Sequence, residues 1–186
     1  MNRNIRLFAA AQGLGLADNA RLFAQLYVTI ADSLITCWNS KFYFNFWRPV
    51  TAIRAADTDG NDLTEPDATW LPLAPTPNHP EYPAAHGSLT GALAYALEDF
   101  FGTKKITVAL TSTSVPGVAM AQHTFTRTQD LVKEIIDARI YGGMHYRTSG
   151  VHGTVIAKTV ANWVSKHYFR PIRGRHKGNA EAIAEK

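Results

Sequence analysis

Large apolar side chains recur every four residues along the first part of the chain. The repeated positions are Leu22, Leu26, Ile30, Leu34 and Trp38. Residues at this spacing lie on one face of an α-helix, so the pattern predicts a long amphipathic helix. Asp18 precedes the first apolar position and is expected to cap the N-terminus of this helix.

Two cationic side chains follow on the same predicted helix. Lys41 continues its apolar face, and Arg48 comes seven residues later, which is two turns if the helix extends through the aromatic stretch. Pro49 then disfavours helical geometry at Arg48 itself. Because two cations on one helix face repel each other, the spacing indicates an anion bound between them.

Three further helices are predicted downstream, over residues 83–101, from about 128 to 141, and from about 149 to 168. Pro83 suits the first helical position, and glycines follow the first and second of these helices. The expected apolar positions are Leu89, Leu93, Leu97 and Phe100 in the first, Leu131, Ile135 and Ala138 in the second, and Val151, Val155, Val160 and Trp163 in the third. Most of the chain is therefore expected to be helical.

The remaining segments predict little regular structure. Residues 105–114 are rich in Thr and Val and predict one short strand or extended segment. Residues 57–83 are interrupted by prolines and predict a long loop, which is either functional or a solvated insertion. We expect one all-α helical domain over residues 1–186, with this loop and a basic flexible tail from about 170 to 186.

Composition narrows the class of protein. The hydrophobic fraction of 46% is that of a globular chain, and the net charge of +4 owes much to the C-terminal run, so nucleic-acid binding is not expected. The single cysteine, Cys37, excludes an internal disulfide and a thiolate metal cluster. We expect a soluble protein and find no clear signal peptide or membrane span in the sequence. The compartment is left open, because a secretory signal could precede the chain if it is a piece of a longer protein.

Three separated patches carry residue types suited to a tetrahedral oxyanion. They are Lys41 with Arg48-Pro49, Pro83-Ala84-Ala85-His86, and Arg139 with His145. Guanidinium forks, an ammonium group and free N–H groups at a helix start are the donors that such an anion requires. The sequence therefore predicts that these patches converge on one phosphate-like anion.

The same patches resemble the signature of the vanadium-dependent haloperoxidases and the type 2 phosphatidic acid phosphatases. The first patch keeps the six-residue gap, the second matches at its first and last positions, and the third keeps the five-residue gap. The likeness spans roughly residues 20 to 170 and is greatest to the soluble bacterial haloperoxidase-like branch. It implies a helical bundle of the acid phosphatase/vanadium-dependent haloperoxidase type.

The resemblance also implies roles for these residues. Vanadate would be the cofactor, with His145 bonded to its vanadium and His86 exchanging protons with hydrogen peroxide. Its oxygens would be bound by Lys41, Arg48, Ala84, Ala85 and Arg139. The implied reaction is oxidation of halide, bromide or iodide ahead of chloride. Phosphate fits the same site, so a phosphatase that hydrolyses phosphomonoesters through a phosphohistidine is the alternative.

Several positions depart from the family pattern or add to it. Ala84 replaces a serine, Ala85 replaces a glycine, and Ser149 stands where an aspartate orients the histidine. These changes leave open a third reading, a catalytically degenerate anion-binding scaffold. His79 stands where the family's bromoperoxidases carry a second histidine and the chloroperoxidase an aromatic residue, whereas Trp38 stands where the chloroperoxidase has tryptophan. With Ser149 they are candidates for halide binding or for support of the site.

The histidines of the chain also suggest a zinc site as an alternative. A zinc site built on His145 and His152, two turns apart, lacks the accompanying ligand motifs and is not favoured.

The soluble haloperoxidases carry a large helical portion before the lysine, whereas only forty residues precede Lys41 here. The chain is therefore expected to be a fragment or to complete its core as a homodimer.

Overall fold

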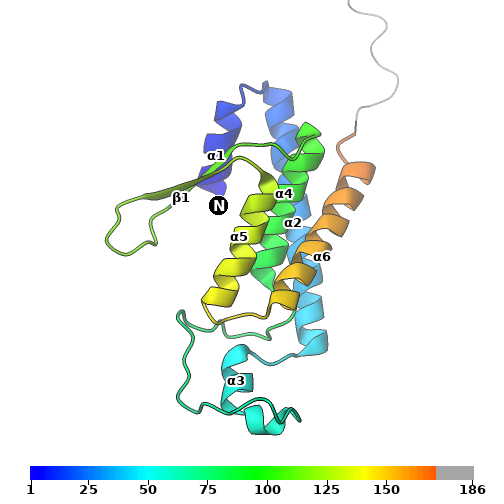
Figure 1. Cartoon of the computed structure of the whole chain (residues 1–186). Coiled ribbons are helices and arrows are strands. Elements are labelled where there is room, and N and C mark those ends of the chain that lie inside the picture. The colour runs from blue at the N-terminus through cyan, green and yellow to red at the C-terminus, as the bar shows by residue number, and fades with distance from the viewer. Residues whose placement is uncertain (171–186) are drawn as a thin grey trace, which may run out of the picture.

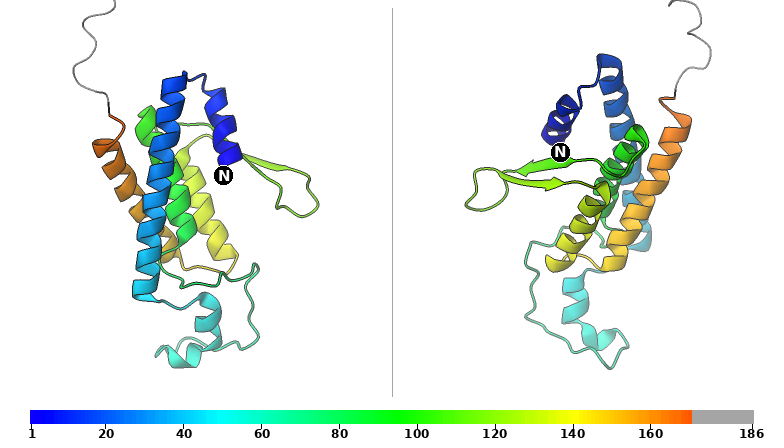
Figure 2. Two further views of the ribbon diagram at one scale, coloured as in Figure 1. Left: turned by 180° about the vertical axis from the view of Figure 1, so that it is seen from behind. Right: turned by 45° about the horizontal axis from the view of Figure 1, so that its top comes forward.

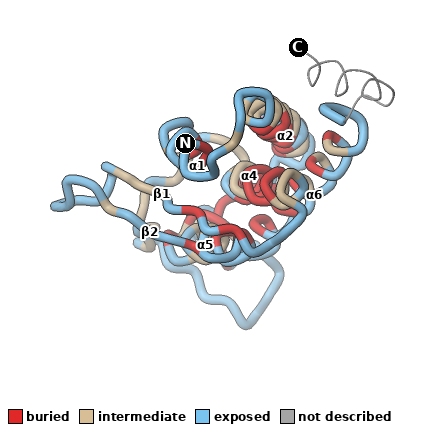
Figure 3. The backbone as a smooth tube through the Cα atoms, turned by 90° about the horizontal axis from the view of Figure 1, so that it is seen from above, coloured by how far each residue is buried: buried red, intermediate tan, exposed pale blue. Residues whose placement is uncertain are grey.

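Four long helices run side by side, and α4 lies between the other three (Figures 1 and 3). The computed structural model describes residues 1–170, so most of the predicted basic tail lies outside the described residues. Helix α4 contacts α2, α5 and α6. The four helices are α2 (Leu16–Phe44), α4 (Ala85–Phe101), α5 (Thr128–Tyr141) and α6 (Arg147–His167). The predicted all-α bundle with a short extended segment is confirmed.

Smaller elements complete the described part of the chain. They are α1 (Asn2–Ala11), α3 (Pro49–Arg54), the 3₁₀ turn η1 (Ala56–Thr58), β1 (Val108–Ser112) and β2 (Ala121–Phe125). The two strands form an antiparallel hairpin in which Val108 pairs with Phe125. The hairpin extends from the side of the bundle (Figure 2). Its second strand was not predicted because the central residues of β2 are polar and exposed.

The buried face of α2 differs from the predicted one in its second half. Leu22, Leu26 and Ile30 are buried, but Trp38 is 41% exposed. An α-helix has 3.6 residues per turn, so a strict four-residue spacing drifts around its axis. The buried face instead takes a three-residue step to Ser33 and continues through Cys37 to Lys41. This step carries a lysine into the interior. The helix begins after Gly15, so Asp18 lies in its first turn and is not the cap.

Helices α4 and α6 approach each other closely because their facing residues are small. The predicted valine face of α6 is wrong: Val151 and Val155 are 43% and 55% exposed. The buried face is formed by Ser149, Gly150, Gly153, Thr154, Ala157, Ala161 and Val164. A Cβ at Gly153 would lie 2.4 Å from the carbonyl oxygen of Ala84. The two helix starts are thereby held in contact.

This close approach gives a first prediction about stability. Replacing Gly153 with alanine is expected to lower the free energy of unfolding by about 1–3 kcal/mol, because the added methyl group meets main-chain atoms that cannot move independently of α4. Chemical denaturation followed by circular dichroism measures the change. Lys158→Ala, at an exposed position on the same helix, is the control and should change stability little. An unchanged midpoint for Gly153→Ala would contradict this account of the packing.

One end of the bundle gathers four helix termini and the long loop. Helices α2 and α5 end there, and α4 and α6 begin there (Figure 1). Between η1 and α4, residues 59–84 form no helix or strand. Helix α4 starts at Ala85, so the prediction that Pro83 opens it is wrong; Pro83 is the last loop residue before the N-cap, Ala84. None of the helices in the described residues has the length and apolar character needed to cross a membrane.

Candidate active site

The predicted site residues meet at this end of the bundle, each brought by a different element. Lys41 lies in the last turn of α2 and Arg139 in the last turn of α5, while His86 is in the first turn of α4. His145 lies just before α6. Cations in the last turn of a helix are favoured by the helix dipole, and the start of α4 favours an anion. The bundle topology therefore places these charges together.

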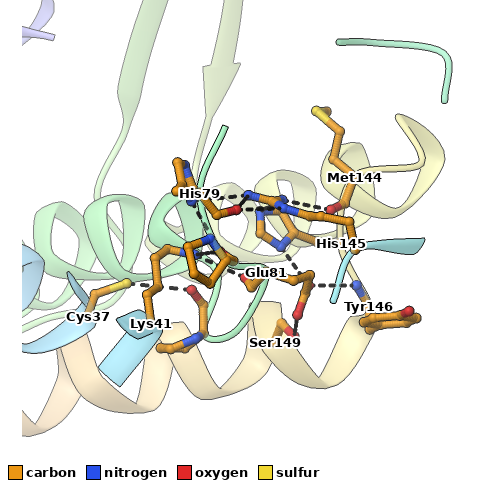
Figure 4. Close-up of polar contacts among 11 residues, drawn as sticks. Cys37, Lys41, His79, Glu81, Met144, His145, Tyr146 and Ser149 are labelled. Carbon is orange, nitrogen blue, oxygen red and sulfur yellow. Dashed lines mark hydrogen bonds and ion pairs between the residues drawn. The ribbon is translucent and has the colours of Figure 1, made fainter. Parts of the chain in front are cut away.

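Lys41 is fully buried and is held by the main chain of the loop. Its Nζ donates to the carbonyl oxygens of Pro80 at 2.8 Å and Glu81 at 3.0 Å (Figure 4). Burial lowers the pKa of Lys41 to about 8, with the nearby Arg48 and Arg139 adding to the effect and Cys37 and Glu81 opposing it. Its ammonium group is thus a desolvated positive charge suited to binding an oxyanion.

Arg48 reaches the same place by a different route from the predicted one. Helix α2 ends at Phe44, where Asn45 adopts a left-handed conformation, and Arg48 is the extended N-cap of α3. The prediction that Lys41 and Arg48 share one helix face is therefore wrong. The guanidinium nevertheless enters the site, where Nε donates to the His79 carbonyl at 3.2 Å and Nη1 to the Met144 carbonyl at 2.9 Å.

The ring of His145 is oriented by a residue that the sequence did not reveal. Glu81, at the end of the loop, accepts a 2.6 Å hydrogen bond from His145 Nδ1, and its other oxygen accepts one from Ser149 Oγ, also at 2.6 Å (Figure 4). The Nη1 of Arg48 lies 3.1 Å from His145 Nε2. A guanidinium can only donate, so Nε2 carries the lone pair and Nδ1 the proton. The nitrogen expected to bond vanadium is thus the unprotonated one.

The charge states of this pair follow from their surroundings. Burial lowers the pKa of His145, although the Glu81 hydrogen bond opposes it. Burial alone would raise the pKa of Glu81, but the hydrogen bonds from His145, Ser149 and the Tyr146 N–H outweigh it and lower that pKa. At neutral pH the pair is therefore a carboxylate and a neutral imidazole.

His86 and Arg139 complete the group of titratable and cationic residues. His86 is exposed, yet the protein displaces part of the solvent around its ring, and the charges of Arg139, His145, His79 and Lys41 repel its proton; together these lower the pKa of His86 to about 4. Arg139 has a buried Nε with no hydrogen-bond partner in the described part of the chain. Buried donors are normally paired, so this nitrogen is free to donate to an acceptor such as an oxyanion oxygen.

The alanines at the start of α4 contribute differently. Ala84 is fully buried, and its N–H donates to the carbonyl oxygen of Ser149 at 3.0 Å. The prediction that this N–H points freely toward an anion is therefore wrong. Ala85 and His86 are the first two helical residues, and their N–H groups have no partner within the helix. The helix start thus offers Ala85 and His86 rather than Ala84.

Trp38 and His79 lie against each other at the edge of this group. Their ring centroids are 5.1 Å apart, and Lys41 Nζ lies 5.8 Å from the Trp38 ring. His79 Nδ1 is 3.1 Å from both the Pro80 carbonyl oxygen and Arg48 Nη2. Both residues therefore border the cations, although Trp38 is not part of the core, and their role in halide binding or support of the site stays a prediction.

The residues present fit a tetrahedral oxyanion better than a divalent metal. Three cations, one of them with an unpartnered buried guanidinium nitrogen, lie at the same end of the bundle as an imidazole lone pair. Within residues 1–170 no group of three or more His, Cys, Asp and Glu side chains could hold a metal ion. His152, the second histidine of the zinc hypothesis, bonds to the Tyr82 hydroxyl at 2.8 Å instead. Vanadate fits because it is an anion that accepts a histidine nitrogen.

Comparison with known proteins agrees with this reading. Residues 21–174 match the family described as the VCPO second helical-bundle domain. The vanadium chloroperoxidase of Curvularia inaequalis is 34% identical over 95 residues, which cover 46% of this chain and 15% of that protein.

Solved structures extend the likeness to the fold. A bacterial vanadium-dependent iodoperoxidase superposes with a TM-score of 0.72 at 25% identity, covering 88% of this chain and 37% of that one. The apo form of a bacterial vanadium-dependent chloroperoxidase superposes with a TM-score of 0.67 at 22% identity, covering 83% and 37%. The chain thus spans little more than a third of the length of these structural relatives.

Proposed function

Because the chain belongs to the vanadium haloperoxidase superfamily, as its match to the second helical-bundle domain shows, we propose that it binds vanadate at the bundle end and supports halide oxidation by hydrogen peroxide. The observation that carries this proposal is the unprotonated Nε2 of His145, held by Glu81 among three cationic side chains. An oxyanion that accepts a nitrogen ligand would use both this nitrogen lone pair and the positive charges around it.

Each residue has a task in this proposal. Vanadate, when bound, supplies the Lewis-acid chemistry that activates peroxide toward halide. Lys41, Arg48 and Arg139 bind its oxygens and offset their negative charge. His86 is neutral at neutral pH and can accept a proton from hydrogen peroxide and return it to the departing water. His145 anchors the anion through Nε2.

Halide preference is the finer part of the proposal. We expect bromide or iodide to be oxidised ahead of chloride, because His79 borders the cations where an aromatic residue accompanies chloride oxidation in the family pattern. Trp38 packs on His79 and restricts the motion of its ring. The iodoperoxidase among the structural relatives is in keeping with this order, whereas another structural relative and the curated relative are chloroperoxidases.

Phosphoryl transfer is a second candidate, favoured by the same feature. An imidazole whose Nδ1 donates to a carboxylate presents Nε2 as a nucleophile, and attack on phosphorus would give a phosphohistidine. His86 would need to be protonated to serve as the acid for the leaving group, and its low pKa disfavours that role at neutral pH. Halide oxidation is therefore proposed first.

The experiment begins with an orthovanadate titration of the protein, in which binding is measured by the change in absorbance and by thermal stability. Bromide, iodide and chloride oxidation with peroxide is then assayed beside phosphate release from a phosphomonoester. His86→Ala is expected to retain vanadate binding within about tenfold while losing about 10²–10⁴-fold in halide oxidation, because it removes proton transfer but no oxygen ligand. His123→Ala, on the exposed hairpin, is the control and should change neither.

Several outcomes would redirect the proposal. Phosphate release without halide oxidation would favour the phosphatase. Anion binding without either reaction would favour a degenerate scaffold, and no stabilisation by vanadate or phosphate would end all three readings. Sedimentation of the same samples tests the predicted homodimer, which stays a prediction.

A further inference from the structure

We propose that Glu81 is the positioning residue for His145. Its carboxylate, at the end of the loop, orients the histidine in place of an acidic side chain at position 149, where α6 carries Ser149. This inference rests on the proposed function, since His145 matters through the ligand its Nε2 accepts. Glu81 has no exposed surface, and both of its oxygens are engaged by the site. A buried carboxylate is costly unless it is paired and hydrogen-bonded, so its presence here needs a reason.

The two oxygens of Glu81 have separate partners. Oε1 accepts from His145 Nδ1 and from the Tyr146 N–H at 3.1 Å, while Oε2 accepts from Ser149 Oγ. A main-chain donor and a helix-borne hydroxyl thus fix the plane of the carboxylate. Together with the Arg48 Nη1–H that donates to Nε2, the carboxylate fixes the rotation and the tautomer of the imidazole. Ser149 therefore contributes by holding Glu81, not by contacting His145.

The main chain of Glu81 is fixed as well. Its N–H donates to the carbonyl oxygen of Phe46 at 2.9 Å, and its carbonyl oxygen accepts from Lys41 Nζ at 3.0 Å. The loop end is thereby tied to the segment that carries Arg48 and to the end of α2. Although it comes from an irregular segment, Glu81 is positioned as firmly as a helical residue, which a site requires of a supporting group.

Position 149 could carry the acid in place of position 81. Ser149 Oγ lies 2.6 Å from Glu81 Oε2, so an aspartate at 149 would bring a second carboxylate to the same point. Two carboxylates there would repel, and one would be forced to take up a proton. The site therefore accommodates one acid, supplied by either the loop or the helix, and the two positions should exchange.

This reciprocity defines the test, which uses orthovanadate as the probe. Glu81→Gln keeps the hydrogen-bonding shape without charge and is expected to weaken vanadate binding about tenfold; Glu81→Ala should weaken it by up to about 100-fold. The double variant Glu81→Ala with Ser149→Asp should recover most of that loss. Ser149→Asp alone should weaken binding, because two acids then share the site. Glu134→Gln, which alters an exposed Glu–His pair at 3.0 Å, is the matched control and should bind normally.

A second measurement does not depend on vanadate. Nitrogen-15 NMR of His145 should report the Nδ1–H tautomer in the unaltered protein, a smaller share of that tautomer in Glu81→Ala, where only Arg48 still favours it, and recovery in the double variant. Glu81 acting only as a structural residue would lower stability and leave both tautomer and affinity unchanged, which would overturn the proposal. If Glu81→Ala does not fold, the affinity of Glu81→Gln decides. If the unaltered protein binds no vanadate, the proposed function fails while the tautomer still tests the role of Glu81.

Discussion

Replacing His145 with glutamine is expected to abolish orthovanadate binding while leaving the protein folded. The glutamine amide can still donate to Glu81, so the buried carboxylate keeps a partner, but no imidazole nitrogen remains to bond vanadium. We expect the loss in affinity, and in any halide oxidation, to exceed the 10²–10³-fold that removing one hydrogen-bond donor costs an active site. Isothermal titration with orthovanadate measures it.

Sulfate provides an internal comparison for the same variant. A sulfate ion is held only by hydrogen bonds and charge, so His145→Gln should weaken sulfate much less than vanadate. His145→Ala would additionally remove one of the hydrogen bonds to the buried Glu81 carboxylate and should lower stability by about 1–3 kcal/mol. Equal losses for the two anions would show that His145 is not a ligand.

The second large effect is a loss of oxyanion affinity as the pH rises above about 8. Lys41 is protonated below its pKa of about 8 and neutral above it, and only the protonated form attracts the anion. A bound anion raises that pKa, so affinity should be level below about pH 8 and then fall by up to tenfold per unit. Sulfate is the suitable probe because its own charge is constant over this range.

Lys41→Met removes the titrating group at similar volume. This variant should bind sulfate about tenfold or more weakly at pH 7, in line with a charged hydrogen bond, and its remaining affinity should not show the decline above pH 8. Stability should move the other way in the unaltered protein. The unfolded chain binds the Lys41 proton up to pH 10.5 and the folded chain only to about 8, so this group makes stability rise between those values. A decline in affinity that persists in Lys41→Met would show that a group other than Lys41 causes the pH dependence.

The elements were predictable where burial follows simple periodicity. The leucines of α2 and α4 identified those helices because large side chains must be buried against something. The face of α6 was mispredicted because close packing against α4 selects small residues, which carry little hydrophobic signal. Helix α3 is too short to show a period. Local pattern therefore predicted which segments are helical but not how near the helices lie.

The site was predictable as a set of charges but not as a network. The spacing of Lys41, Arg48, Arg139, His86 and His145 indicated a shared anion site, and the fold places these residues at one end of the bundle. Glu81 was missed because it lies in a proline-rich segment that has no periodicity. One signal could have found it: the serine at position 149 leaves the histidine without an acid, and Glu81 is the acidic residue nearest in sequence to the His86 patch.

The main chain at the end of the loop and the cations of the site fix each other's positions through hydrogen bonds. Carbonyl oxygens of His79, Pro80 and Glu81 already accept from Arg48 and Lys41, so an entering anion competes with main-chain dipoles for these donors. A diffuse monovalent ion offers the cations little more than those dipoles do, whereas a multiply charged tetrahedral oxyanion offers far more. We expect the loop to impose a lower limit on the charge density of any ligand. Even a large excess of halide would then not displace the oxyanion from this position.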